Sequence, residues 1–166
     1  MNMTDKTSIF KSVANTLQLQ GFMVIKKDDA RPWGGFYVID EQHAPEFVKR
    51  YFPGEKLDDL KITEKISPKI LLVAPNTRLS WQYHFRRAEI WRCIDGPVAV
   101  ITSHTDEERE QHTLQGGDII RLKQGERHRL VGLETWGIVA EIWQHTDAEN
   151  PSNEDDIVRV QDDFGR

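Results

Sequence analysis

The chain has 166 residues, which is the length of about one domain. With 38% hydrophobic residues it can bury a core, and its net charge of −5 is the wrong sign for a general nucleic-acid binder. No apolar run approaches the ~18 residues of a membrane span, and the acidic, polar N-terminus is unlike a signal peptide. The single cysteine, Cys93, excludes an internal disulfide. We therefore expect one cytoplasmic domain without membrane or nucleic-acid partners.

An amphipathic helix is predicted near the start of the chain. Apolar residues recur at helical spacing between Thr7 and Leu19. Thr7 or Ser8 is the expected N-cap, because both have short side chains that can accept a hydrogen bond from the first turn. Gly21 is the expected end of the helix.

The rest of the chain is dominated by short strand signals. They are separated by turn dipeptides such as Pro-Asn and Asp-Gly, and this spacing is typical of an all-β sandwich or barrel. A short helix is expected around Glu46–Tyr51. We assign residues 1–30 to an N-terminal helical extension and residues 31–166 to the β domain. The expected strands are Phe36–Ile39, Ile70–Val73, Leu79–Tyr83, Ile90–Ile94, Val98–Thr102, Ile119–Leu122, Arg129–Val131, Ile138–Trp143 and Ile157–Val160.

The arginines are unevenly distributed. Eight of the twelve lie between Arg78 and Arg129, where Lys123 is the only lysine. Arginine suits bidentate capture of phosphate or carboxylate, so this cluster is a candidate anion site in an acidic protein. The alternative is that these side chains simply alternate outward on exposed strands.

Two histidines, a glutamate and a glutamine form a candidate metal-binding set in the sequence. Gln82 and His84 are two apart, so on a strand both side chains point to the same face. Glu89 has the wrong parity for one uninterrupted strand, and a turn or bulge at residues 85–88 must intervene if it is to join them. With His128 these residues form a mixed nitrogen and oxygen donor set that suits a divalent transition metal. On the residues alone, exposed polar strand positions remain the simpler interpretation.

The spacing of these residues resembles the double motif of the cupin superfamily. The match has Asn in place of the first Gly, Gln in place of the first His, and Lys and Gly in place of the later Pro and Asn. Because Asn tolerates a left-handed backbone, the first exchange is mild. The matching positions are Asn76-x5-Gln82-x-His84-x4-Glu89-x6-Gly96 and Gly117-x5-Lys123-x-Gly125-x2-His128-x3-Gly132.

This resemblance implies a cupin (RmlC-like) jelly-roll barrel with a metal ion in its mouth. The implied ligands are Gln82, His84, Glu89 and His128. Zinc is the expected metal, with manganese, cobalt, iron and nickel as alternatives. Cupins often pair, so the resemblance also implies a homodimer.

A narrower resemblance is to the type II mannose-6-phosphate isomerases. It covers about residues 31 to 166, and its most specific part is the end of the chain. The family has further histidines where this chain has Phe85, Arg86 and Ile90, and we expect these differences to alter the pocket wall. The shared stretches are RPWG at Arg31–Gly34, LSWQYHFRRAEIW at Leu79–Trp91, HRL at His128–Leu130 and EDDIVRVQDDFGR at Glu154–Arg166.

Type I phosphomannose isomerases offer a second comparison. The stretches that begin at Lys69 and Leu79 resemble their phosphate-site pattern, and residues 155–159 resemble a segment that ends in a catalytic arginine. This resemblance implies that Lys69 and Ser80 contact substrate and that Arg159 is catalytic. Alternatively, Lys69 starts a strand at the surface, Ser80 faces outward and Arg159 caps the acidic segment.

Together these features predict a metal-dependent aldose–ketose isomerase of a sugar phosphate, such as mannose 6-phosphate and fructose 6-phosphate. The phosphate is expected among Lys69, Arg78, Ser80 and Arg129. The reaction also needs a base with a pKa near neutrality. Glu141, His145 and a metal-bound hydroxide all remain candidates, and Glu141 is our choice.

Other functions of the same barrel stay open. The main alternative is a non-catalytic cupin that binds a sugar or a sugar nucleotide. A metal-dependent oxygenase and a sugar epimerase are weaker options, since a fold does not determine a reaction.

Overall fold

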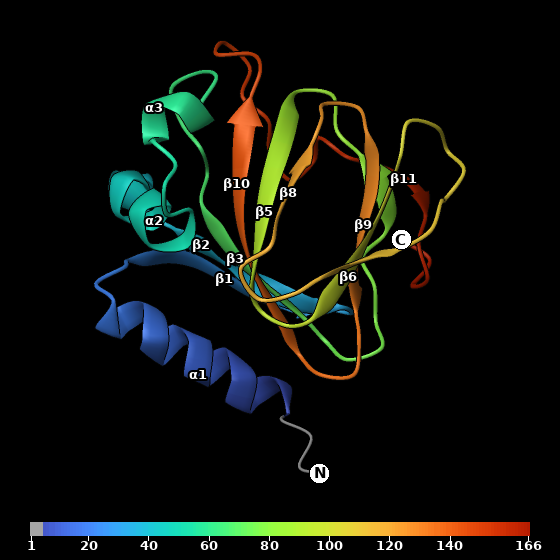
Figure 1. Cartoon of the computed structure of the whole chain (residues 1–166), viewed down its shortest axis with the longest axis horizontal. Coiled ribbons are helices and arrows are strands. Elements are labelled where there is room, and N and C mark those ends of the chain that lie inside the picture. Colours follow the sequence, from blue (N-terminus) through green and yellow to red (C-terminus); the bar gives the residue numbers. More distant parts are fainter. Residues whose placement is uncertain (1–4) are drawn as a thin grey trace.

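The computed structural model describes residues 5–166 and shows two antiparallel sheets that face each other (Figure 1). The six-stranded sheet has the order β1-β2-β3-β10-β5-β8, and the five-stranded sheet has the order β11-β4-β9-β6-β7. The strands are β1 (Val24–Arg31), β2 (Gly34–Ile39), β3 (Lys69–Val73), β4 (Trp81–Tyr83), β5 (Arg87–Asp95), β6 (Val98–Ser103), β7 (His112–Leu114), β8 (Ile119–Leu122), β9 (Arg127–Gly132), β10 (Gly137–His145) and β11 (Val158–Gln161). This is the predicted jelly-roll barrel of the cupin fold.

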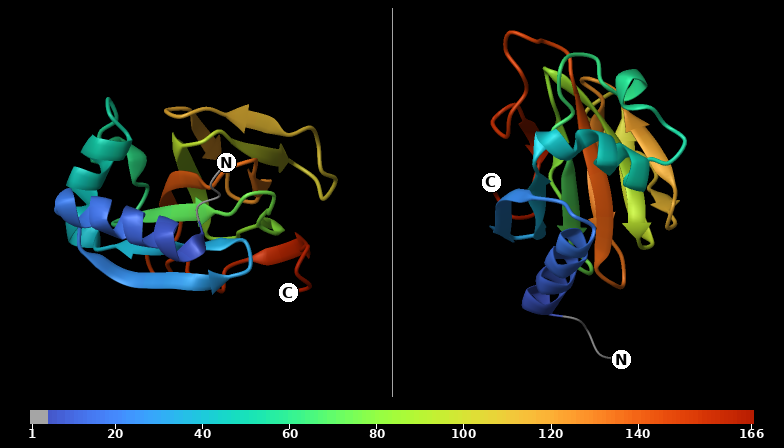
Figure 2. Two further views of the ribbon diagram at one scale, coloured as in Figure 1. Left: turned by 90° about the horizontal axis from the view of Figure 1, so that it is seen from below. Right: turned by 90° about the vertical axis from the view of Figure 1, so that its left-hand side faces the viewer.

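The helices lie on the outer side of the six-stranded sheet (Figures 1 and 2). Within residues 5–166, none of them has the length and apolar composition needed to cross a bilayer. They are α1 (Lys6–Leu19), the 3-10 helix η1 (Glu41–His43), α2 (Ala44–Tyr51) and α3 (Leu57–Leu60).

The start of α1 differs from the prediction. Asp5 is the N-cap, and its carboxylate accepts a hydrogen bond from the backbone N–H of Ser8 at 2.7 Å. Thr7 and Ser8 therefore lie inside the first turn, and both N-cap assignments were wrong. An ionised aspartate has the added advantage that it complements the positive end of the helix dipole. The helix ends at Leu19, and Gly21 follows in a left-handed conformation with φ of 83°.

The core is divided between the two faces of the six-stranded sheet. Strand β3 is buried along its whole length, and its side chains alternate between the two faces. Ile70 and Leu72 pack with the helices, whereas Leu71 and Val73 point toward the opposite sheet. A continuous apolar run is what a strand covered on both sides requires. The residues on the inner face, which include Leu71 and Val73, form the part of the core that lies between the two sheets.

All nine predicted strands are present, but β1 and β7 were missed. Residues 24–30, assigned to a helical extension, are most of β1, which pairs with β2 at the edge of the sheet. The first four residues of that extension lie outside the described residues. The sequence of β1, VIKKDDAR, is charged because an edge strand is largely exposed, and charge at an edge opposes pairing with other chains. It therefore lacks the apolar alternation on which strand prediction depends.

Candidate metal centre

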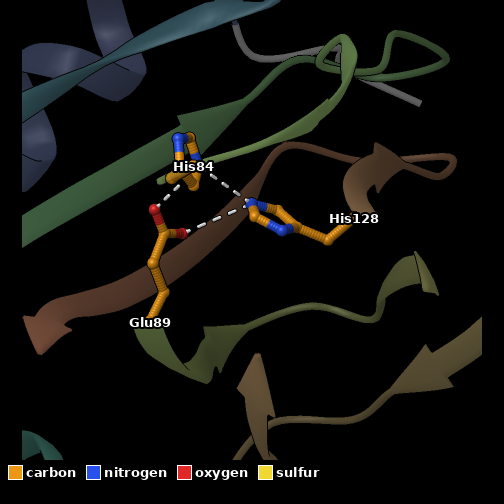
Figure 3. A group of neighbouring side chains, drawn as sticks. All are labelled: His84, Glu89 and His128. Atoms are coloured by element: carbon orange, nitrogen blue, oxygen red, sulfur yellow. Dashed lines mark hydrogen bonds and ion pairs between the residues drawn. The ribbon is translucent and has the colours of Figure 1, made fainter. Parts of the chain in front are cut away.

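Three predicted ligands converge inside the barrel, although they come from both sheets. His84 follows β4, His128 lies on β9 of the same sheet, and Glu89 lies on β5 of the opposite sheet. A turn after β4 separates His84 from β5, as the parity of Glu89 required. All three side chains are buried and point toward one another (Figure 3).

The distances between the ligand atoms are those of a metal site. His84 Nε2 lies 3.2 Å from His128 Nε2 and 3.1 Å from a carboxylate oxygen of Glu89, and the other Glu89 oxygen lies 3.6 Å from His128 Nε2. Metal–ligand bonds of about 2.0–2.2 Å in a tetrahedron place the donor atoms about 3.3–3.6 Å apart. The three side chains are therefore spaced to hold one divalent ion.

Both imidazoles have a fixed tautomer. His84 Nδ1 donates to the backbone carbonyl of Asp156 at 2.7 Å, and His128 Nδ1 donates to that of Glu126 at 3.1 Å. In a neutral ring this leaves Nε2 unprotonated and available to a metal. Burial lowers the pKa of His128 to about 4, so its ring is neutral at pH 7. A neutral ring is the state of His128 that metal binding requires.

Gln82 is positioned to complete the set. It lies directly opposite His128 in the pairing of β4 with β9, so both side chains face the barrel interior. Its amide nitrogen donates to the carbonyl of Ser80, which leaves the amide oxygen free to act as a ligand. Gln82 lines the same cavity as Glu89 and His128.

Arg87 is a contact that the sequence analysis missed. Its guanidinium is buried, donates to Glu89 at 2.7 Å and lies 3.2 Å from His84 Nε2. Burial alone would raise the pKa of Glu89, but the positive charge of Arg87 contributes to holding it well below its usual value. Arg87 and Glu89 are two apart on one strand, so side-chain parity could have identified it.

A cavity of about 70 Å³ lies against three of the candidate ligands, Gln82, Glu89 and His128. Among the predicted site residues, Lys69, Ser80, Glu141 and Arg159 line it together with Gln82, Glu89 and His128. Lys69 and Ser80 are buried, so the alternatives that put them on the outside are wrong. The Lys69 ammonium forms an ion pair with Glu154 and lies 4.0 Å from the centre of the Trp143 ring.

Glu141 is held by two indoles. Its carboxylate oxygens accept hydrogen bonds from Trp91 and Trp143, both at 2.8 Å. Burial and the negative charge of Glu89 raise the pKa of Glu141 to about 8. The same Trp91 N–H also contacts Glu89 at 3.1 Å, so Glu141 lies beside the candidate metal site.

Two predicted phosphate contacts do not line this cavity. Arg129 is fully buried and its N–H groups are used by the carbonyl of Leu79, by Glu108 and by Gln161. It follows His128 directly on β9, so its side chain points to the other face of the sheet. Arg78 pairs with Asp163, at 2.7 and 2.9 Å. Our placement of phosphate at these two residues is therefore not supported by the geometry.

The expected change to the pocket wall is also not found. Ile90 is buried in the core on the helix side of the six-stranded sheet, while Phe85 is 60% exposed. Arg86 lies on the turn after β4, where it binds the carbonyl of Asn150. None of the three lines the cavity within the described residues. The alternation of β5 explains the position of Ile90, which faces away from its neighbours Glu89 and Trp91.

Asp156 is a second residue whose role the sequence did not reveal. Its carboxylate accepts the backbone N–H groups of Phe85 and Arg86 at 2.9 and 3.0 Å, and the hydroxyl of Ser152 at 2.6 Å. These bonds fix the turn that carries His84, while the Asp156 carbonyl orients the His84 ring. The residue belongs to the EDDIVR stretch, but the turn that it holds is 70 or more residues away in sequence.

Solved structures with this fold include distant proteins of varied description. The capsular polysaccharide assembling protein CapF from Staphylococcus aureus matches with a TM-score of 0.57 at 11% identity, over 82% of this chain and 34% of CapF. KdgF from Halomonas sp. has a TM-score of 0.52 at 14% identity, over 78% of this chain and 91% of KdgF. Vicilin from Corylus avellana has a TM-score of 0.54 at 19% identity, over 84% of this chain and 36% of vicilin. The chain thus spans about a third of the length of CapF, and these similarities establish the fold alone.

The sequence comparisons are more specific about family. No curated protein sequence matches the chain. The family model described as mannose-6-phosphate isomerase C-terminal matches residues 40–162, which is well over half of the chain and includes every proposed metal ligand. The chain therefore belongs to the mannose-6-phosphate isomerase C-terminal family of cupin domains.

Proposed function

We propose that this protein is a metal-dependent aldose–ketose isomerase of a sugar phosphate, with mannose 6-phosphate and fructose 6-phosphate as the substrate pair. The observation that supports it is a buried set of His84, His128 and Glu89 at metal-ligand spacing, with Glu141 in the cavity that Glu89 and His128 line. A divalent metal bound there would act as a Lewis acid on a substrate carbonyl oxygen. Zinc suits two imidazoles, a carboxylate and an amide oxygen.

The reaction moves a proton between two neighbouring carbons, and Glu141 is the proposed group that carries it. Its carboxyl lines the cavity and its pKa of about 8 lies close to a neutral operating pH. The indole N–H groups of Trp91 and Trp143 hold the carboxyl in one orientation. These contacts also exclude water from the carboxyl, which strengthens every polar contact made inside the cavity.

Lys69 and Ser80 are proposed substrate contacts. Both line the cavity, and the ammonium of Lys69 could bind a substrate oxygen once Glu154 has been displaced. The type I resemblance gives Arg159 a catalytic role. Its position in the cavity lining is consistent with substrate contact, and it lies on β11 at the edge of the five-stranded sheet.

The test is a combined metal and activity measurement on the full chain. Purified protein should contain about one divalent ion, and the metal-loaded protein should interconvert mannose 6-phosphate and fructose 6-phosphate. Glu89→Gln should lose both metal and activity, whereas Glu134→Gln, an exposed residue outside the cavity, should lose neither. A metal-loaded protein without isomerisation would instead favour a non-catalytic sugar-binding cupin.

A further inference from the structure

Besides Arg87, whose guanidinium contacts Glu89 and His84, three arginines from separate parts of the chain line the cavity. Arg31 ends β1, Arg159 lies on β11 and Arg166 is the last residue of the sequence. None of them belongs to the arginine cluster between residues 78 and 129. The anion site sought in that cluster has a better set of candidates here.

The sheet register aims Arg159 at the metal ligands. Arg159 lies directly opposite Gln82 in the pairing of β11 with β4, and Gln82 lies opposite His128 in the pairing of β4 with β9. Residues paired across antiparallel strands point to the same face, so the three side chains form one row that faces the cavity. β11 is the edge strand, which puts Arg159 at the solvent end of this row.

The positive charge of these arginines is incompletely neutralised. Within residues 5–166, Arg159 forms no hydrogen bond or ion pair through its side chain. Arg31 binds Asp28 and Arg166 binds Asp162, each through its Nε, and Arg166 also through one terminal nitrogen. Burial lowers the pKa of Arg159, as do the charges of Arg166 and Arg31, while Asp162 and Glu154 oppose this. The positive charges of Arg31 and Arg166 therefore both act on Arg159.

We propose that Arg31, Arg159 and Arg166 bind the phosphate group of the substrate at the mouth of the cavity. The assignment rests on the proposed function for its orientation, in which the sugar extends from this mouth toward His84, Glu89 and His128. A phosphate dianion suits the site because each guanidinium offers paired donors to two oxygens, and three of them would surround it. It would also give the Arg159 side chain a direct anionic partner, which it lacks within residues 5–166.

The test measures binding of inorganic phosphate to the full-length, metal-free chain by isothermal titration calorimetry. Removing the metal with a chelator prevents phosphate from binding to it directly. Arg159→Gln should weaken binding at least about tenfold, because charge-assisted hydrogen bonds are lost. Arg159→Lys keeps the positive charge but lacks the paired N–H donors of a guanidinium, so it should give an intermediate loss of phosphate affinity. Binding to the wild-type chain should weaken as NaCl is added.

Two arginines serve as matched controls. Arg121 is exposed on β8 and pairs with Glu55, and Arg78 pairs with Asp163 outside the cavity lining. Arg121→Gln and Arg78→Gln should bind phosphate as the wild type does. A loss in Arg78→Gln with none in Arg159→Gln would overturn the assignment in favour of the 78–129 cluster. Thermal melting confirms that each variant is folded, and exposed Arg159 has no described side-chain partner to lose.

A second titration separates this site from the enzymatic proposal. Fructose 6-phosphate should bind the metal-free chain, and Arg159→Gln should weaken it by the same factor as inorganic phosphate. Phosphate binding without isomerisation of the metal-loaded protein would leave the site standing and refute the isomerase. Unchanged affinity of Arg159→Gln for both ligands would refute the site, whatever the activity.

Discussion

His84 and His128 present their Nε2 atoms to each other at 3.2 Å, while each ring donates its Nδ1–H to a backbone carbonyl. Two unprotonated nitrogens at this distance repel each other unless a cation or a donor lies between or beside them. Arg87 partly relieves this repulsion, because its terminal nitrogen lies at hydrogen-bond distance, 3.2 Å, from His84 Nε2. The arrangement of the two histidines is therefore suited to binding a cation.

Metal binding should stabilise the protein, and Glu89 should be essential for it. At a free zinc concentration 100 times Kd, binding adds about 2.7 kcal/mol to the free energy of unfolding. For a chain of this size that raises Tm by about 5–10 °C. Glu89→Gln should remove the rise and lower zinc affinity by at least about a hundredfold, measured by calorimetry and differential scanning fluorimetry. An equal zinc-dependent rise in Tm for this variant would place the metal elsewhere.

Asp156 should control the metal site without touching the metal. Asp156→Ala removes the acceptor for the backbone of Phe85 and Arg86, so the turn that carries His84 loosens. We expect zinc affinity to fall by about 10–100-fold, the range seen when groups that orient ligands are removed. Asp155→Ala is the matched control, because Asp155 is the exposed neighbour. Equal zinc affinities in the two variants would contradict the positioning role.

The metal-free protein should lose stability in mild acid. His145 is buried, its Nδ1 accepts the backbone N–H of Ser152, and its Nε2 contacts the Ser67 hydroxyl. Burial lowers the pKa of His145 to about 4, as it does for His128. The unfolded chain therefore binds more protons between pH 6.5 and 4. The stability contributed by each neutral histidine is complete above pH 6.5 and falls by on the order of 2 kcal/mol as the pH drops to 4.

His145→Asn offers a direct check of this pH dependence. Asparagine can still accept the Ser152 N–H but cannot be protonated, so the part of the acid-induced loss that belongs to His145 should disappear. The part that belongs to His128 should remain, partly offset by the protonation of Glu141. Urea unfolding of the metal-free protein at several pH values measures the difference. A variant that is as acid-sensitive as the wild type would show that His145 does not contribute.

Glu141 should be needed for turnover but not for metal binding. Glu141→Gln should lower kcat by about 10²–10⁴-fold, the usual contribution of a positioned acid–base group. Zinc content should stay the same, because Glu141 is not among the three converging ligands. Retention of more than a tenth of wild-type kcat would exclude Glu141 as the proton carrier and return attention to His145.

The same substitution predicts a pH effect on stability. The native pKa of about 8 is above the ordinary value of 4.5, so the native metal-free protein holds a proton that the unfolded chain releases. Stability associated with the protonated carboxyl is therefore present below pH 4.5 and is lost as the pH rises to about 8. Glu141→Gln, which never ionises, should lose less stability over this interval. Urea titrations at pH 5 and pH 8 measure it.

Much of the local structure could be predicted because it depends on neighbouring residues. The apolar spacing of α1, the turn between His84 and Glu89 and the left-handed backbone at Asn76, with φ of 56°, all follow from short stretches of sequence. The parity of Gln82 and His84 could also be read directly. Strand β1 was missed because charged edge strands carry no apolar alternation.

The sequence by itself therefore determined nine of the described strands, helix α1, the turn between His84 and Glu89 and the candidate metal ligands. Only the tertiary structure decided that Arg31, Arg159 and Arg166 share the cavity, that Arg78 and Arg129 do not, and that Asp156 clamps the turn at His84. The physical reason is the order of strands in the two sheets. Periodicity indicates on which face of its own strand a side chain lies. Which side chain lies opposite it depends on how the strands pair, and paired strands can be far apart in the sequence.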